Sequence, residues 1–406
     1  MASKTRVAVL ASRFPYPTEK GDKLRLYFQL KYLATDFDVY LFALSESGIS
    51  SEDKEEIRQY CKEIFVYEEP ESHRRYRVMR NFFDPLPSQV HYFYSIEIRT
   101  RFLKDFFRIN ADVVFCQLYR MSRYLQGIQV PKVLDVMDSF ATIAQLQAAN
   151  ARYFYERWFW RKEHRMIQRY ESQLMDPFHH YTVISERDAE LLQLPAEVPV
   201  TIIRNGIDVE YFQSYPNKEM KPAYDMAFIG NMEYKPNIEA VRYIREQLLP
   251  YFDENNVKAK ILIGGKGASR LENQFPNHPG LVFHDWYEDI RDAYYDARMF
   301  IAPLFLGSGM QNKVLEAMAS NRPVVCSSHV IAAMPMLAPY VRVADHPEVY
   351  LHHYKQLSDN PFSEEKQNQI FTVLKNELTW ESQVEKLKKI LNDIGTNYEW
   401  NFTRYH

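Results

Sequence analysis

Two charged side chains beside a glycine-containing turn are the residues of this chain best suited to chemistry. Lys313 and Glu316 follow the turn Gly307-Ser308-Gly309 and lie at positions i and i+3. Side chains at this spacing are neighbours on one face of a helix. A glycine turn that opens a helix also presents unpaired N–H groups and the positive end of the helix dipole. Lys313 could therefore hold a diphosphate, and Glu316 could accept hydrogen bonds from ribose hydroxyls.

The sequence around these two residues predicts a strand, a helix and a second strand. Met299–Leu306 is an apolar run long enough for one buried strand, and Pro323–Cys326 predicts another. Between them, Gln311–Ala319 has helical spacing, with an inward stripe formed by Val314, Leu315 and Met318. Because glycine turns before helices are common, a plain connection with a surface Lys–Glu pair is the alternative.

This stretch resembles a known nucleotide-sugar site. The string P-L-x-x-G-S-G-x-x-x-K-x-L-E-A-M-A-x-x-x-P-V-V, which starts at Pro303, is similar to that of retaining glycosyltransferases of family 4 (glycosyl transferases group 1). In this respect the chain is also similar to the sugar transferases of exopolysaccharide and lipopolysaccharide assembly. The resemblance implies that the glycine loop and the lysine face the donor diphosphate and that the glutamate binds the ribose. It implies catalytic roles for Lys313 and Glu316, and substrate binding by Gly307, Ser308, Gly309 and Met310.

Two positions depart from the family pattern. Many members carry Glu where this chain has Ser308, and the usual Gly after the helix is Asn321 here. Members that lack the Glu but keep G-x-G-x-x-x-K are familiar, so the first departure weakens the contact with the donor sugar. Asn tolerates a positive φ better than most residues, so we expect the turn to survive at Asn321.

Composition restricts the function classes. The 406 residues suit two to three domains, and the net charge of −3 gives no signal for a nucleic-acid partner. Cys61, Cys116 and Cys326 fit no metal-ligand spacing and favour a reducing, cytoplasmic setting. No apolar run approaches the roughly 18 residues of a membrane span, and Val7–Ala11 is too short for a signal-peptide core.

The beginning of the chain predicts a βαβ unit with parallel strands. Strands at Arg6–Leu10 and Asp38–Leu44 flank a helix at Lys23–Ala34. The loop R-F-P-Y-P-x-x-x-G-D-x-x-R resembles the first loop of family 4 enzymes, which lies in the cleft between their domains. The resemblance implies substrate contacts at Gly21, Lys23 and Arg25. An ordinary charged first helical turn is the alternative for the two cations.

Two carboxylates lie at the end of the predicted buried strand Val133–Val136. The carboxyl ends of parallel strands face the region where such sheets bind ligands. In family 4 this strand end carries the residue near the acceptor hydroxyl. The resemblance therefore implies that role for Asp138, our first choice, or for Asp135, our second. The alternative is that Asp138 or Ser139 caps the next helix.

Two stretches combine aromatic residues with cations. His73–Arg80 holds four arginines and no acid, and the aromatic segment Asn81–Tyr94 follows it. Ser139–Asp176 has neither Gly nor Pro, which predicts one long helix or a broken pair, and its middle at Arg152–Tyr170 mixes aromatics with cations. These stretches fit helices at an anionic membrane surface. The basic run also fits the phosphate groups of an acceptor or a solvated helix end, and the second stretch also fits packed helices with extended arginines.

The alternation of strands and helices continues in the second half. The string Arg204-Asn205-Gly206-Ile207-Asp208 resembles the N-G-V-D segment that leads between the family's two domains. A strand at Asp225–Ile229 ends at Gly230, where the family often has Arg and Lys to hold the diphosphate. The Arg is missing here, so more of the phosphate charge should fall on Lys313. The expected additional substrate contacts are Asn205, Gly230, Asn231, Lys235, Gly264, His284 and Trp286, with a structural role as the alternative for Trp286.

The resemblance implies an α/β protein with GT-B architecture. Two doubly wound Rossmann-like domains would face a cleft, and the C-terminal helix would cross back to the first domain. We expect an acceptor-binding domain at residues 1–212, a linker at 213–222, a nucleotide-sugar-binding domain at 223–380 and the returning helix at 381–406.

The expected activity is transfer of a sugar, with retention of configuration, from a UDP- or GDP-sugar to a glycan or lipid-linked acceptor. No metal or cofactor is expected, since Asp36-Phe37-Asp38 has the D-x-D form but precedes a strand, away from the ligand-binding end. We expect a cytoplasmic protein with a peripheral contact to the inner face of the membrane. A nucleotide-sugar epimerase and a non-catalytic, membrane-associated scaffold are the alternatives. The lack of a clear acid–base pair disfavours the first, and the Lys313–Glu316 pair disfavours the second.

Overall fold

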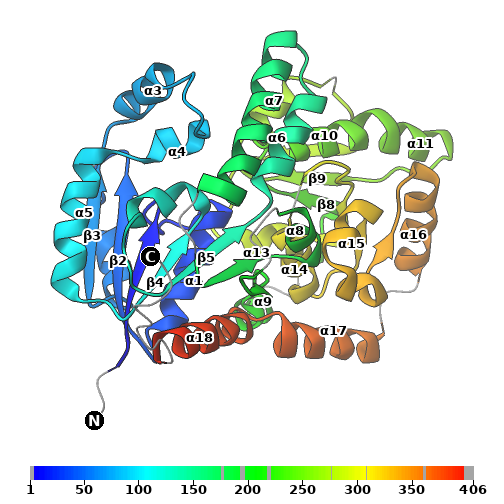
Figure 1. Cartoon of the computed structure of the whole chain (residues 1–406). Coiled ribbons are helices and arrows are strands. Elements are labelled where there is room, and N and C mark those ends of the chain that lie inside the picture. Colours follow the sequence, from blue (N-terminus) through cyan, green and yellow to red (C-terminus); the bar gives the residue numbers. More distant parts are fainter. Residues whose placement is uncertain are drawn as a thin grey trace. The chain divides into compact units, whose positions relative to one another are not determined.

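The computed structural model describes residues 4–174, 178–192, 197–216, 221–275, 277–307, 309–359 and 363–396. The chain divides into two compact units. Unit 1 is Met1–Arg204 with Trp380–His406, and unit 2 is Asn205–Thr379. Each unit contains one parallel sheet accompanied by helices (Figure 1). The predicted class of two Rossmann-like α/β sheets is confirmed.

The sheet of unit 1 has seven strands in the order β3-β2-β1-β4-β5-β6-β7. Because alternate residues of a strand point to opposite faces, β1 contributes to two hydrophobic cores. Its Val7 and Val9 join one core, and its Ala8 and Leu10 join the other. The strands are β1 (Arg6–Ala11), β2 (Asp38–Ser45), β3 (Glu63–Glu68), β4 (Val113–Gln117), β5 (Lys132–Met137), β6 (His180–Val183) and β7 (Val200–Ile202).

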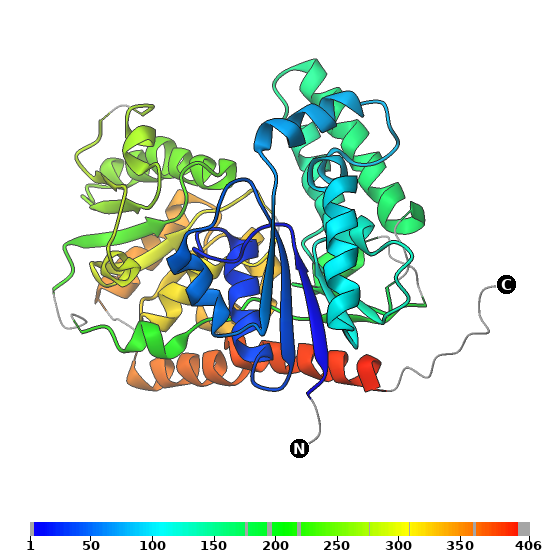
Figure 2. The same ribbon diagram turned by 90° about the vertical axis from the view of Figure 1, so that its left-hand side faces the viewer.

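Helices cover both faces of this sheet (Figure 2). α1, α2 and α18 pack on the face of Val7, and α5 packs on the face of Ala8. The helices of unit 1 are α1 (Gly21–Leu33), α2 (Ser51–Arg58), α3 (Glu71–Arg80), α4 (Ser88–Phe93), α5 (Ile96–Ile109), the 3-10 helix η1 (Tyr119–Leu125), α6 (Phe140–Ala149), α7 (Phe154–Arg169), the π-helix η2 (Tyr170–Leu174), α8 (Glu186–Leu191) and α18 (Trp380–Thr396).

The C-terminal helix α18 belongs to unit 1, as predicted. Its Trp380 stacks on Phe28 of α1, with ring centroids 4.9 Å apart. Its Val384, Leu387 and Leu391 are buried in the core that also holds Val7. The apolar face of α18 therefore completes one face of the unit 1 sheet.

An ion pair lies at the centre of unit 1. Arg25 of α1 donates to Asp135 of β5 over 2.7 Å and 3.0 Å, and both residues are fully buried. Gln29 and Thr182 also donate to this carboxylate, over 3.1 Å and 2.9 Å, and Arg25 donates to the carbonyl of Ile203. Arg25 and Asp135 were expected to contact substrate. In this structure they connect α1 to β5 and present no exposed group to a ligand.

The stretch without Gly or Pro forms a broken pair of helices, the second of the two predicted alternatives. α6 ends at Asn150, whose side-chain amide donates to the carbonyl of Leu146 over 2.9 Å. Such a bond competes with continuing the helix. α7 begins after Tyr153, whose backbone N–H donates to the Glu156 carboxylate over 3.4 Å. The two helices pack against each other.

The sheet of unit 2 has six strands in the order β10-β9-β8-β11-β12-β13. They are β8 (Tyr224–Ile229), β9 (Ile261–Gly264), β10 (Leu281–His284), β11 (Ala297–Ala302), β12 (Val324–Cys326) and β13 (Arg342–Val343). The helices are α9 (Val209–Gln213), α10 (Lys235–Tyr243), the π-helix η3 (Ile244–Leu248), α11 (Leu249–Glu254), α12 (Ala268–Glu272), α13 (Ile290–Tyr295), α14 (Asn312–Ala319), α15 (Ser328–Ala333), the 3-10 helix η4 (Pro335–Tyr340), α16 (Pro347–Asp359) and α17 (Glu364–Glu377).

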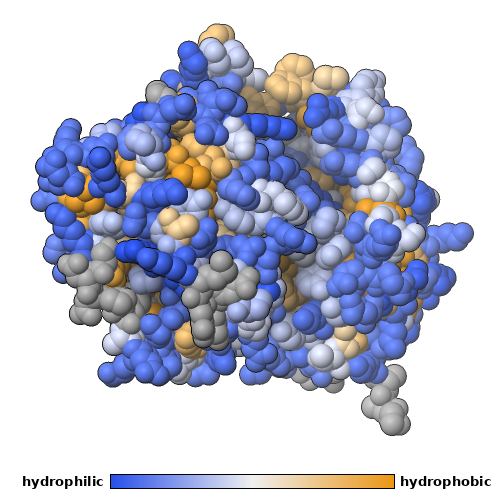
Figure 3. All heavy atoms as spheres, turned by 180° about the vertical axis from the view of Figure 1, so that it is seen from behind, coloured by the Kyte–Doolittle hydropathy of each residue, from blue (hydrophilic) through white to orange (hydrophobic). Residues whose placement is uncertain are grey.

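Within the described ranges, no helix combines the length and the apolar character that a membrane span requires. The face of the molecule in Figure 3 is mostly hydrophilic, and its hydrophobic side chains gather in separate patches.

The buried ion pair gives a test of the fold. Arg25→Met leaves the Asp135 carboxylate buried without its cation, so we expect unit 1 to lose about 3–5 kcal/mol of unfolding free energy. Urea unfolding followed by circular dichroism measures this loss. Arg58→Met, which removes an exposed ion pair with Glu55, is the matched control and should change little. Equal effects of the two substitutions would contradict a central role for the buried pair.

Candidate functional site

The strand order of unit 2 locates a ligand site at one edge of its sheet. The connection from β8 leads to β9 on one side, whereas β11 pairs with β8 on the other side. Open α/β sheets bind ligands beside the carboxyl ends of the strands at such a switch point. Gly230 follows β8, and the glycine loop that precedes Lys313 follows β11. The topology thus brings these two predicted segments together.

Lys313 is held at this switch point by an amide and an aromatic ring. Its Nζ donates to Oδ1 of Asn237 over 2.6 Å and lies 4.8 Å from the ring centroid of Phe228. Burial lowers the pKa of Lys313 to about 7, although the Glu316 carboxylate acts in the opposite direction. An anion beside this ammonium would restore its charge, because an opposite charge favours the protonated form.

Glu316 lies on the same face of α14 and has a partner of its own. The hydroxyl of Tyr294 donates to one of its carboxylate oxygens over 2.5 Å. Burial raises the pKa of Glu316, although the Tyr294 hydrogen bond and Lys313 lower it. The hydrogen bond orients a carboxylate that keeps further lone pairs for a ligand.

Gly230 leaves the space that Lys313 and Asn237 occupy. A Cβ at this position would lie 2.9 Å from Nζ of Lys313 and 2.8 Å from Nδ2 of Asn237. Asn237 is buried, and its Nδ2 donates to the carbonyl of Asn231 over 2.8 Å. Sequence reasoning singled out Gly230 and Asn231 but missed Asn237.

The loop before α14 is shaped by positive φ angles, 112° at Gly307 and 74° at Gly309. Ser308 between them lies outside the described residues. Gln311 precedes α14, and its side chain makes no capping hydrogen bond, so among the described residues the first N–H groups of the helix have no cap from this position. The expected turn after α14 is present, since Asn321 has a φ of 57°.

The other residues predicted in unit 2 are arranged as follows. Asn205 donates to Oδ1 of Asn312 over 3.1 Å, at the first position of α14, and Met310 is buried. Lys235 is exposed at the start of α10. Gly264 and His284 end the neighbouring strands β9 and β10. Beyond β10, Trp286 is 76% exposed, so it has no packing role within unit 2.

Asp138 in unit 1 follows an irregularity in β5. The pairing of β5 with β6 shifts between Asp135 and Met137, and Met137 has a φ of 65°. A bulge of this kind re-aims the side chains after it. Oδ1 of Asp138 is buried without a hydrogen-bond partner among the described residues. Burial is the main cause that raises the pKa of Asp138 to about 7, and the negative charge of the Asp188 carboxylate adds to it. The helix cap is Ser139, whose hydroxyl accepts from the N–H of Thr142.

A charged cluster that sequence reasoning did not assemble lies at the switch point of unit 1, between β1 and β4. Arg120 is buried and donates to Asp22 over 3.0 Å and to Ser12 over 2.9 Å, and Arg13 also pairs with Asp22. Burial raises the pKa of Asp22, but the two arginines outweigh this effect and lower it overall. Gly21 and Lys23 flank this carboxylate in the first turn of α1. A signal for Arg120 was available, because it follows the apolar run that forms β4.

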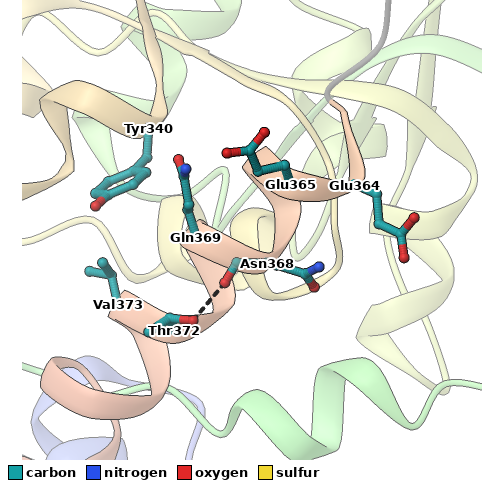
Figure 4. A pocket seen from close by; sticks show the side chains of 7 residues that line it. All are labelled: Tyr340, Glu364, Glu365, Asn368, Gln369, Thr372 and Val373. Carbon is teal, nitrogen blue, oxygen red and sulfur yellow. Dashed lines mark hydrogen bonds between the residues drawn. The ribbon is translucent and has the colours of Figure 1, made fainter.

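Two surface grooves lie apart from these residues. The groove in Figure 4 runs along α17 and is lined by Tyr340, Glu364, Glu365, Asn368, Gln369, Thr372 and Val373. Its lining includes two carboxylates and no cation, so it does not suit a diphosphate. The second groove, in unit 1, runs along α3. Three arginines and three carboxylates contribute to its lining, and Arg77 pairs there with Glu69.

Comparison with known proteins supports one class. Residues 223–339 match the family described as Glycosyl transferases group 1. An uncharacterized 44.6 kDa protein in the cps region of Klebsiella pneumoniae is 20% identical over 350 residues, which is 80% of this chain and 83% of that protein.

Solved structures share the fold over nearly the whole chain. A glycosyltransferase from Rickettsia africae has a TM-score of 0.63 and 9% identity, over 98% of this chain and 100% of that one. Anabaena Alr3699/HepE in complex with UDP and glucose has a TM-score of 0.64 and 10% identity, over 96% and 100%. The chain thus has the GT-B fold of these proteins, and its residues 223–339 match the family Glycosyl transferases group 1, in agreement with the predicted resemblance.

The environment of Lys313 predicts a pH dependence of donor binding. The ammonium of the free protein loses its proton as the pH rises through about 7, and a bound diphosphate should raise this pKa. Binding then takes up a proton, so affinity should be full below about pH 7 and fall up to about tenfold per pH unit above it. Titration calorimetry with a UDP- or GDP-sugar, in buffers of different ionisation enthalpy, measures both the affinity and the proton uptake.

Lys313→Arg is the matched control for this titration. Arginine stays charged over the whole range, so this variant should bind without the pH dependence. A wild-type affinity that stays constant from about pH 6 to 9 would contradict the assignment of the titrating group.

Proposed function

We propose that this glycosyltransferase transfers a sugar from a nucleotide-diphosphate sugar to a glycan or lipid-linked acceptor, with retention of configuration. The observation that carries the proposal is the position of Lys313 beside the start of α14. An ammonium of lowered pKa lies there near a helix terminus whose N–H groups lack a side-chain cap. Both features favour a bound anion with the charge of a diphosphate.

UDP and GDP are the proposed donor nucleotides. Anabaena Alr3699/HepE was solved with UDP, and an Escherichia coli relative of the fold was solved with UDP-2-fluoro glucose. Glu316 would accept hydrogen bonds from the ribose, held in place by Tyr294. Gly264, His284 and Trp286, at and just beyond the ends of β9 and β10, would lie towards the base.

The proposed reaction needs electrostatic stabilisation more than covalent chemistry. The bond between the anomeric carbon and the phosphate oxygen breaks, and a bond from the acceptor oxygen forms on the same face of the sugar. The acceptor hydroxyl gives its proton to the released phosphate oxygen. Lys313 and the N–H groups of α14 stabilise the charge that develops on the leaving diphosphate.

Asp138 of unit 1 is the proposed partner of the acceptor hydroxyl. Its carboxylate has an oxygen without a hydrogen-bond partner and a pKa raised to about 7, whereas Asp135 is saturated by three donors. A buried group of this kind is a candidate functional residue on physical grounds. Glycans or lipid-linked sugars are the proposed acceptors, in line with the cps-region relative.

The two assignments predict different kinetic defects. Lys313→Ala should lower transfer by about 100-fold or more, the effect of losing one transition-state donor, with little change in melting temperature. Asp138→Asn should lower transfer while leaving donor binding intact. The assay follows radiolabelled sugar from UDP- or GDP-sugars into membrane-lipid and polysaccharide acceptors, and NMR of the product tests retention.

Lys355→Ala removes an exposed cation of α16 in the same unit and serves as the control. Normal transfer by Lys313→Ala would remove this residue from the mechanism. A loss of donor binding in Asp138→Asn would place Asp138 at the donor instead of the acceptor.

A further inference from the structure

Seven large hydrophobic side chains of unit 1 are exposed on two of its segments. One segment is α3 with the loop that follows it, and the other is the turn before α7 with the first turns of that helix. Phe83 is 91% exposed, and Phe154 is 85% exposed. We call the set the aromatic tip: Tyr76, Met79, Phe83, Tyr153, Phe154, Tyr155 and Trp158.

The two segments of the aromatic tip contact each other. The ring of Phe82, beside Phe83, lies 6.0 Å from Trp158 and 6.4 Å from Phe159, measured between centroids. Lys162 of α7 donates to the carbonyl of Phe82 and lies 4.1 Å from its ring centroid. The two segments therefore form one continuous surface, and the contacts between them hold it together. Figure 1 shows α3 and α7 extending from the same end of unit 1.

Cations surround the aromatic tip, and the acids near it are engaged. The exposed cations of the two segments include Arg80, Arg152, Arg157, Arg161 and Arg165. Glu163 accepts hydrogen bonds from Ser88, and Glu71 pairs with Arg75. Oδ1 of Asp84 lies 3.2 Å from Nε2 of His91. The surface thus combines unpacked aromatic groups with an excess of positive charge.

The spacing along α7 matches the depth of a bilayer interface. Phe154 and Arg161 are seven residues apart, which corresponds to about 10 Å along a helix. Amphipathic segments bury their apolar groups about 5–10 Å into the boundary between headgroups and acyl chains. With α7 steeply inclined to the bilayer and Phe154 at that depth, Arg161 reaches the level of the phosphates. A second copy of the chain is a poorer occupant, because it would bring like charges together.

We propose that unit 1 docks on an anionic lipid bilayer through the aromatic tip, with the arginines of α7 at the lipid phosphates. The proposal deepens the proposed function, on which it rests for the choice of a lipid-linked acceptor over a free glycan. The docking itself involves none of the residues assigned to the donor.

Vesicle co-sedimentation of the full chain tests the docking. We expect binding to vesicles of equimolar phosphatidylcholine and phosphatidylglycerol, and weak binding to phosphatidylcholine alone. The triple variant Phe83→Ser/Phe154→Ser/Trp158→Ser should reduce binding to anionic vesicles by at least about tenfold. Phe107→Ser, which changes an aromatic of α5 that is 67% exposed and lies away from the tip, should bind like the wild type.

A second variant separates charge from apolar insertion. Arg157→Glu/Arg161→Glu/Arg165→Glu should lose the preference for anionic vesicles, and raised salt should weaken the wild type in the same way. Thermal shifts with UDP and GDP report the donor site independently in every variant. If the wild type binds UDP or GDP but does not bind anionic vesicles, the docking proposal alone is overturned. If it binds the vesicles but neither nucleotide, the proposed function alone is overturned.

Two further results would overturn the docking proposal. One is unchanged vesicle binding by the triple aromatic variant. The other is a stable dimer of the wild type in sedimentation velocity that the same three substitutions dissociate, because the tip would then be an interface between copies of this chain.

Discussion

An ammonium group held by one amide oxygen above an aromatic ring is the interaction on which the proposed donor site depends. Lys313 has Asn237 and Phe228 as these two neighbours, and burial lowers its pKa to about 7. The positive charge of this buried ammonium is poorly neutralised by its neighbours, and a bound diphosphate would supply negative charge beside it. The surroundings of Lys313 keep it in this state: Gly230 leaves room for its Nζ, and α14 points its N-terminus toward the same loop.

Unit 1 shows how different the surroundings of two neighbouring carboxylates can be. Asp135 lies in β5 and Asp138 follows directly after it. Asp135 is saturated by Arg25, Gln29 and Thr182, whereas Oδ1 of Asp138 has no hydrogen-bond partner in the described part of the chain. The irregular pairing of β5 with β6 and the positive φ of Met137 separate the two. Backbone strain of this kind recurs at functional sites, where the surrounding structure compensates for it.

The sequence predicted the elements well because apolar runs and glycine turns have local causes. The strand–loop–helix–strand unit around Lys313 follows from such signals, whereas the return of the C-terminal helix and the turn at Asn321 were expected from the family resemblance. Partners distant in sequence could not be predicted. Arg25 was predicted to contact substrate, with an ordinary charged first helical turn as the alternative, and only the pairing with Asp135, 110 positions later, shows its structural role. Asn237 and Tyr294 were missed for the same reason.

The most direct test of the donor site is nucleotide binding by Gly230→Ala. The added methyl group would lie within 3 Å of Lys313 Nζ and Asn237 Nδ2, at 2.9 Å and 2.8 Å, so it displaces the ammonium without removing its charge. Titration calorimetry with UDP and GDP should show that the wild type binds one of them and that Gly230→Ala binds it at least about tenfold more weakly, the scale of a displaced charge-assisted contact. Gly48→Ala, where a Cβ has only one neighbour at 3.9 Å, should bind normally. Equal affinity of Gly230→Ala and the wild type would contradict a diphosphate site at Lys313.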